Sequence, residues 1–146
     1  MKQKISTTLQ KKWGAVMREI LFRGKNVDNT WEYGYLYEIY RDCHMREVIT
    51  YPPNVFDKGK YVEVIPETVG QFTGLTDKNG TKIFEGDIVE NNECLGVVEY
   101  SEEDAMYTVM FNETLYDFGW IGAKMCEVIG NIHDNPELLG GSNNEK

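Results

Sequence analysis

Histidine, cysteine and proline are scarce in this 146-residue sequence, which contains two, three and four of them. The cysteines, Cys43, Cys94 and Cys126, are odd in number and none belongs to a CxxC pair, so the sequence predicts reduced thiols in or near a core. Structural zinc sites pair their ligands at a spacing of roughly two to four residues. Neither His44 nor His133 lies in such a pair, and we expect no metal and no cofactor.

Long hydrophobic runs are also absent. The longest uncharged apolar runs, such as residues 107–111, have only the length of a strand, whereas a transmembrane helix needs about 20 apolar residues. The first residues include lysines but not the apolar stretch of a signal peptide. We therefore expect a cytosolic protein with no membrane partner.

Catalytic motifs are missing as well. The sequence contains no Gly-x-Ser-x-Gly elbow. Gly74 and Gly80 are separated by five residues with no lysine after the second glycine, so this segment fails as a phosphate loop. Four carboxylates in the same stretch do not follow the EF-hand pattern, namely Asp77, Glu85, Asp87 and Glu90. We predict no enzymatic activity, no catalytic residues and no cation site.

Charge of one sign dominates most of the chain. Residues 1–25 contain seven Lys or Arg against Glu19 alone, a net charge of +6, and because the whole chain carries −9, residues 26–146 carry −15. An acidic region of this kind repels the phosphate backbone of nucleic acids. Neutralisation of that backbone by basic side chains supplies most of the affinity of nucleic-acid-binding proteins. The charge either keeps the protein soluble or mimics DNA toward a host nucleic-acid-binding protein.

Alternating hydrophobicity predicts a mainly β, β-rich α+β fold. Aromatic residues at positions i, i+2, i+4 and i+6 of one strand share a face, and the acidic Glu32 and Glu38 flank this row. Such a row either stacks the bases of a nucleic acid or forms a surface that is buried in the core or in an interface. The flanking acidic residues favour the buried or interface surface. The candidate interaction face consists of Trp31, Tyr33, Tyr35 and Tyr37.

The remaining segments are read from β-prone runs and turn residues. Strands are expected over residues 20–22, 31–38, 47–51, 61–65, 69–74, 88–89, 95–100, 105–111 and 125–130, and a helical turn over 134–139. Turns are expected at 23–26, 77–80, 85–87 and 101–104, with loops at 41–46 and 54–60. The segment 112–122 shows no clear period.

The richest turn chemistry lies in residues 65–90. Asn79 and Gly80 tolerate the positive φ of a tight reversal, and Gly70 and Gly74 suit a bent strand or a close backbone approach. We assign structural roles to eight residues here, namely Gly70, Gly74, Asp77, Asn79, Gly80, Glu85, Gly86 and Asp87.

Several ordered blocks give the chain a family likeness. Residues 17–25, 31–36, 65–75, 77–80, 83–89, 128–132 and 135–139 together resemble the YopX family of phage and prophage proteins. The resemblance implies an SH3-type barrel in the C-terminal part with additional N-terminal strands, and residence in the host bacterial cytoplasm. It implies no established enzymatic activity and no catalytic residues.

The likeness divides the chain into residues 1–16, an N-terminal extension, residues 17–139, a YopX-like domain, and residues 140–146, a polar tail. Family members commonly begin at the residue matching Met17. The extension is basic, and its apolar residues allow either a short amphipathic helix starting near Ser6 or a basic arm.

Taken together, these features predict a non-enzymatic accessory protein that acts through protein–protein contacts, including self-association and contact with a host or phage protein. Three alternatives are an acidic DNA mimic, a nucleic-acid binder that uses the barrel and the basic arm, and a small hydrolase. We expect no nucleic-acid partner.

Overall fold

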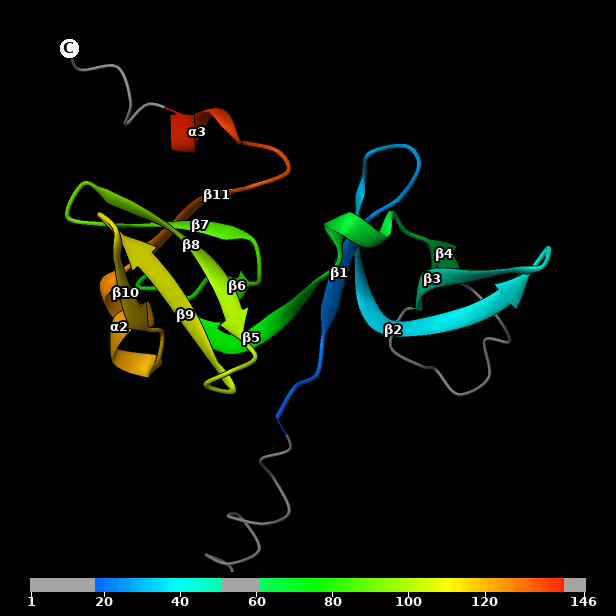
Figure 1. Ribbon diagram of the computed structural model, residues 1–146, viewed down its shortest axis with the longest axis horizontal. Coiled ribbons are helices and arrows are strands. Elements are labelled where there is room, and N and C mark those ends of the chain that lie inside the picture. The colour runs from blue at the N-terminus through cyan, green and yellow to red at the C-terminus, as the bar shows by residue number, and fades with distance from the viewer. Residues whose placement is uncertain (1–17, 51–60, 141–146) are drawn as a thin grey trace, which may run out of the picture.

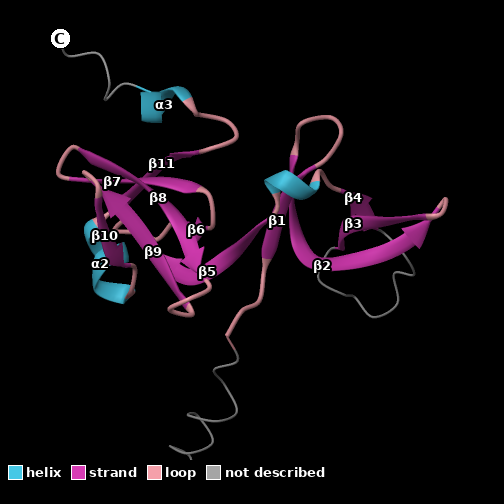
Figure 2. Ribbon diagram, in the orientation of Figure 1, coloured by secondary structure: helices cyan, strands magenta, loops and turns pink. Residues whose placement is uncertain are grey.

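The computed structural model describes residues 18–50 and 61–140, and strands dominate both ranges (Figures 1 and 2). The predicted loop at 54–60, the N-terminal extension and nearly all of the polar tail lie outside the described residues. In chain order the strands are β1 (Phe22–Lys25), β2 (Trp31–Arg41), β3 (His44–Thr50), β4 (Tyr61–Glu63), β5 (Gly70–Thr76), β6 (Lys82–Phe84), β7 (Asp87–Asn91), β8 (Cys94–Ser101), β9 (Met106–Phe111), β10 (Thr114–Asp117) and β11 (Glu127–Asn131). The helical segments are η1 (Pro66–Thr68), α2 (Trp120–Met125) and α3 (Glu137–Gly140).

The first sheet has the strand order β4-β3-β2-β1-β5-β6, and all its pairs are antiparallel. The predicted turn at 23–26 is wrong, because Gly24 lies within β1, where a Cβ atom would meet the Val64 side chain at 3.1 Å. The chain reverses later, at Asn29, whose φ is 63°. The predicted loop at 41–46 is also wrong, because Asp42 and Cys43 join β2 to β3 with φ values of 51° and 63°.

The second sheet has the order β10-β9-β8-β7-β11. Its consecutive strands β7 to β10 form an antiparallel meander, and two of its turns, at residues 92–93 and 112–113, place both central residues at positive φ. Helix α2 covers one side of this sheet (Figure 1). Between them lies the main core, made of Ile83, Val89, Val98, Val109, Phe118, Ala123 and Cys126.

The stretch 65–90 joins the two sheets. The Gly86 N–H donates to the Val98 carbonyl at 2.9 Å, and the Ile132 N–H donates to the Gly86 carbonyl at 2.9 Å. Farther along, the Lys78 N–H donates to the Cys126 carbonyl at 3.1 Å. In Figure 1, β5 runs between the lobe of β1 to β4 and the lobe of β7 to β11.

The β-rich fold is confirmed, but the SH3-type barrel is not. Across the described ranges the strands pair as two sheets, and neither sheet closes on itself. The hairpin of β5 and β6 completes the first sheet, leaving β10 and β11 as the outer strands of the second. No helix in these ranges is long and apolar enough to cross a membrane.

Candidate functional site

Asp77 anchors the turn between β5 and β6. Its buried carboxylate accepts the N–H groups of Asn79 at 2.8 Å and Thr81 at 2.9 Å from its own turn, and of Val128 at 3.0 Å from β11. Burial by itself raises the pKa of Asp77, but these three donors together bring that pKa below its ordinary value. The carboxylate is therefore occupied with holding β11 to the turn.

The glycines of the same stretch occupy backbone positions that resist side chains. A Cβ atom on Gly70 would lie 2.6 Å from the Glu85 carbonyl oxygen. The other three, Gly74, Gly80 and Gly86, have φ values of 84°, 82° and 82°, in the left-handed region that glycine adopts without steric cost.

Glu85 and Asp87 face back toward the first sheet. The Glu85 carboxylate accepts the Gln71 N–H at 2.8 Å. Asp87 is buried and lies 2.6 Å from the Arg23 guanidinium of β1, while it also accepts the Phe84 N–H at 2.8 Å. Burial raises the pKa of Asp87, and the neighbouring Arg23 only partly opposes this. Arg23 is itself buried, 4.7 Å from the centre of the Trp31 ring.

A second ion pair joins the lobes beside the first. The buried Lys25 ammonium contacts the Asp134 carboxylate and donates to the Asn29 side chain at 2.8 Å. Trp31 Nε1–H donates to the same carboxylate at 2.6 Å. Hydrogen bonds from Lys25, Trp31 and Asn131 hold the pKa of Asp134 well below its ordinary value. We call Arg23, Lys25, Trp31, Asp87 and Asp134 the polar joint.

His133 lies at the border of this joint. Its ring is 5.9 Å from the Trp31 ring, and burial together with the cationic Arg23 and Lys25 lowers its pKa. Among residues 18–50 and 61–140, no group of three His, Cys, Asp or Glu side chains is placed to hold a metal ion. The contacts of the polar joint are therefore those of a structural connection between the two sheets.

The aromatic row of β2 is divided by the joint. Trp31 is drawn into it, and the Tyr33 ring packs edge-on against Phe84 at 5.7 Å. Tyr35 and Tyr37 lie farther along the strand and are exposed. Tyr33 is exposed as well, at 43% against 38% for Tyr35 and 54% for Tyr37, so all three tyrosines of the candidate interaction face are open to a partner.

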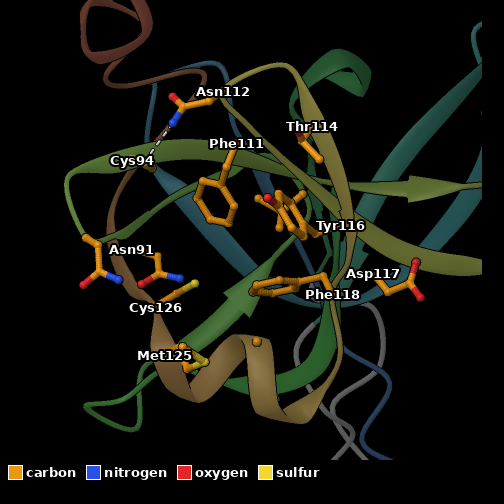
Figure 3. A pocket seen from close by; sticks show the side chains of 13 residues that line it. Asn91, Cys94, Phe111, Asn112, Thr114, Tyr116, Asp117, Phe118, Met125 and Cys126 are labelled. Atoms are coloured by element: carbon orange, nitrogen blue, oxygen red, sulfur yellow. Dashed lines mark hydrogen bonds between the residues drawn. The ribbon is translucent and has the colours of Figure 1, made fainter.

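The second sheet carries a hollow of about 440 Å³ between the β9–β10 hairpin and α2 (Figure 3). Phe111 and Phe118 point into it from the core side, and Tyr116 from β10. The Phe111 and Tyr116 rings lie 6.0 Å apart. Cys126 also lines the hollow, and burial raises the pKa of its thiol, so this thiol is kept protonated rather than activated as a nucleophile.

A second hollow, of about 330 Å³, includes Met110 and Leu115 in its lining. Strand β10 contributes to both hollows, with Tyr116 in the first and Leu115 in the second. Since neighbouring residues of a strand point to opposite faces, the hollows flank β10 on its two sides. Neither lining includes Lys or Arg, and the acidic members are Glu99, Glu113 and Asp117.

Strand β10 is one of the two outer strands of its sheet within the described part of the chain. Phe118 N–H donates to the Tyr107 carbonyl at 2.9 Å, and the antiparallel register continues through Tyr116 opposite Val109. By the alternation of such ladders, the N–H and C=O groups of Leu115 and Asp117 point outward. All four side chains of β10 are exposed.

Sequence patterns did not reveal this edge. Residues 112–122 lack a period because they combine a tight turn, a four-residue strand and a short helix. The turn residues Asn112 and Glu113, with φ values of 48° and 64°, carry no glycine to announce the reversal. In the sequence, the signal for this edge was limited to the apolar residues Leu115, Tyr116 and Trp120, which the structure shows to be exposed.

The model of the YopX family, described as YopX protein, matches residues 21–140. No curated protein matches the chain. The crystal structure of protein EF1440 from Enterococcus faecalis is similar, with a TM-score of 0.50 and 23% sequence identity, and the match covers 84% of this chain and 99% of that one. At that identity the likeness concerns the fold alone.

Proposed function

This chain belongs to the YopX family, and from that premise we propose that it is a phage or prophage accessory protein that binds other proteins and catalyses no reaction. It works in the cytoplasm of the bacterial host. Its first partner is a second copy of itself, and a host or phage protein uses the same surface.

The observation that carries this proposal is the exposed apolar surface around β10. Six large apolar side chains of β9, β10 and α2 are each more than half exposed, namely Met110, Leu115, Tyr116, Trp120, Ile121 and Met125. We call these six residues, with the outer edge of β10, the contact face. These side chains lie on both sides of one sheet edge, and a concentration of exposed apolar side chains around one edge is typical of an interaction site.

The edge strand supports the same reading. Outward N–H and C=O groups on a short strand are a template for pairing with another strand. In an antiparallel pair of two β10 strands related by a two-fold axis, the outward groups of Leu115 meet those of Asp117 in the other copy, and the two Tyr116 residues lie opposite each other. Such an interface buries apolar side chains and also pairs the outward backbone groups of the edge.

The polar joint argues against a nucleic-acid partner. Two of the basic residues that make residues 1–25 cationic, Arg23 and Lys25, are buried and paired with Asp87 and Asp134. They are therefore withdrawn from contact with phosphates, which supply most nucleic-acid affinity.

Sedimentation equilibrium of the full chain over a wide range of concentration tests the proposal. We expect reversible self-association that Tyr116→Glu and Leu115→Glu weaken, because each variant adds a charge to an apolar contact. The matched control is Tyr40→Glu, which changes a 70% exposed tyrosine of the other sheet and should leave association unchanged. A wild-type chain that stays monomeric, or equal effects of all three variants, rejects the proposal.

A further inference from the structure

The hollow between the β9–β10 hairpin and α2 has the dimensions of a small-molecule site. Its volume is about 440 Å³, and sites for small molecules enclose about 300–1,000 Å³, with mainly apolar walls and a few polar groups. Strands β7 to β10 and helix α2 all contribute to its lining. The contact face borders this hollow at Tyr116 and Met125, but contacts between proteins at that border leave the interior of the hollow unfilled.

Aromatic rings form much of its wall (Figure 3). Phe111, Tyr116 and Phe118 all line the hollow. The Phe111 and Tyr116 rings are inclined by 55° to each other, so they are not stacked face to face. Aromatic side chains bind nucleobases by stacking, because every base has a π-face. The wall therefore favours a planar aromatic ligand over a branched aliphatic one.

Amide side chains supply hydrogen-bonding groups at the end of β7. Asn91 and Asn92 line the hollow there, and neither side-chain amide is hydrogen-bonded to another residue within the described part of the chain. An Asn side chain offers both donors and an acceptor. In that arrangement it matches the edge of adenine, which presents the N7 acceptor beside the N6 donor. The hollow thus combines stacking surfaces with groups that recognise a purine edge.

The charge of the lining disfavours phosphate. Among the residues that line the hollow, Asp117 alone is charged. The lysine of α2, Lys124, is directed instead toward β5, where it donates to Thr76 Oγ1 at 2.6 Å. A carboxylate without a cation repels an anion, but it accepts hydrogen bonds from hydroxyl groups. Asp117 is exposed, and it lies on the opposite side of the hollow from Asn91 (Figure 3).

We propose that this hollow binds an uncharged purine nucleoside. The base lies among Phe111, Tyr116 and Phe118 with its hydrogen-bonding edge toward Asn91. The sugar lies toward Asp117 at the open end, where its hydroxyl groups meet the carboxylate and an added phosphate is repelled. This binding function goes beyond the contacts between proteins proposed above, and it does not require self-association.

Titration of the full-length chain with adenosine, followed by calorimetry and by amide chemical shifts, tests the proposal. We expect saturable binding with a Kd of about 0.1–1 mM and shifts at Asn91, Phe111 and residues 116–118. AMP carries the same base and sugar with an added phosphate, so it should bind at least about tenfold more weakly because of Asp117.

Two pairs of variants locate the site. Tyr116→Ala removes a stacking surface and should weaken adenosine binding by at least about tenfold. Its matched control is Leu115→Ala, at a similarly exposed neighbour (54% against 51%) that lines the other hollow, and this control should leave the Kd unchanged. Asp117→Lys should reverse the preference so that AMP binds more tightly than adenosine, whereas Glu113→Lys, beside the other hollow, should leave the preference for adenosine in place.

Four results overturn the inference. They are no saturable binding of adenosine, AMP binding as tight as adenosine binding, equal effects of Tyr116→Ala and Leu115→Ala, and an unchanged preference in Asp117→Lys. Sedimentation of the same samples separates this inference from the proposed function. Self-association without adenosine binding refutes the inference alone, whereas adenosine binding by a chain that stays monomeric refutes the proposed self-association alone.

Discussion

The buried ion pair of the polar joint gives the sharpest test of how the two sheets are held together. Arg23→Met keeps an unbranched side chain that reaches about as far as the arginine Nε but leaves the Asp87 carboxylate, of which 2% is exposed, without its cation. Removal of one partner of a buried pair costs about 3–5 kcal/mol. It also removes a hydrogen bond of 3.2 Å to the Glu85 carbonyl and the contact with the Trp31 ring.

One contribution to the free energy of unfolding offsets part of this loss. Arg23 Nε is buried and has no hydrogen-bond partner among the described residues, and an unsatisfied buried donor costs about 1–3 kcal/mol. Since Met relieves that penalty, we expect a loss of about 3 kcal/mol in the free energy of unfolding, at the lower end of the range. Domains of this size have about 5–15 kcal/mol in total, so the variant should fold but unfold at markedly lower denaturant concentration.

Urea unfolding followed by far-UV circular dichroism measures this loss. The matched control is Arg46→Met, since Arg46 pairs with Glu63 at 3.1 Å and their side chains are 43% and 44% exposed. Exposed pairs contribute about 0–1 kcal/mol. Adding Asp87→Asn to Arg23→Met should recover part of the loss, because the amide removes the unpaired charge and still accepts the Phe84 N–H. If Arg23→Met costs no more than Arg46→Met, the joint does not hold the sheets together.

Three further predictions concern the backbone and pH. Glu113→Gly should stabilise the chain by up to about 1 kcal/mol in urea unfolding, because residue 113 has a φ of 64° and glycine adopts that conformation without strain; a destabilised variant contradicts this. Gly70→Ala should cost about 1–3 kcal/mol, since its Cβ would lie 2.6 Å from a carbonyl oxygen, whereas Gly140→Ala, with nothing within 4 Å, should be neutral, and equal melting temperatures reject the reasoning. The pKa of Asp134 in the folded chain lies below its ordinary value of 3.8. Its carboxylate therefore stabilises the fold above pH 3.8, and this contribution is lost as the pH falls through the pKa of the folded chain. Asp134→Asn should lower the free energy of unfolding more at neutral pH than in acid, and a loss that does not depend on pH contradicts this.

The backbone preferences of glycine and asparagine predicted some of the turns correctly. Asn79 and Gly80 reverse the chain where the sequence places the turn, and Gly80 has the positive φ that motivates it. The same rule was misleading at Gly24, which is needed for the close approach of Val64 and not for a reversal. It was silent at Asp42 and Cys43, where two residues other than glycine take positive φ.

Contacts distant in sequence were beyond such rules. Arg23 and Lys25 were counted as part of a basic segment, yet Lys25 pairs with Asp134, 109 residues away. No local pattern specifies that partner, because the pairing depends on how the two sheets dock. For the same reason the edge at β10 became visible only once the strand order was known, although its apolar residues are plain in the sequence.

Above all, we propose that the contact face at β10 and α2 mediates binding between proteins. Amide chemical shifts of the full-length chain, recorded at increasing protein concentration, test it most directly because they locate the contact as well as detect it. We expect concentration-dependent shifts at residues 114–117 and 120–125 and unchanged shifts at Tyr35 and Tyr37. Shifts confined to those two tyrosines, or spectra that do not change with concentration, would show that the contact face does not mediate binding.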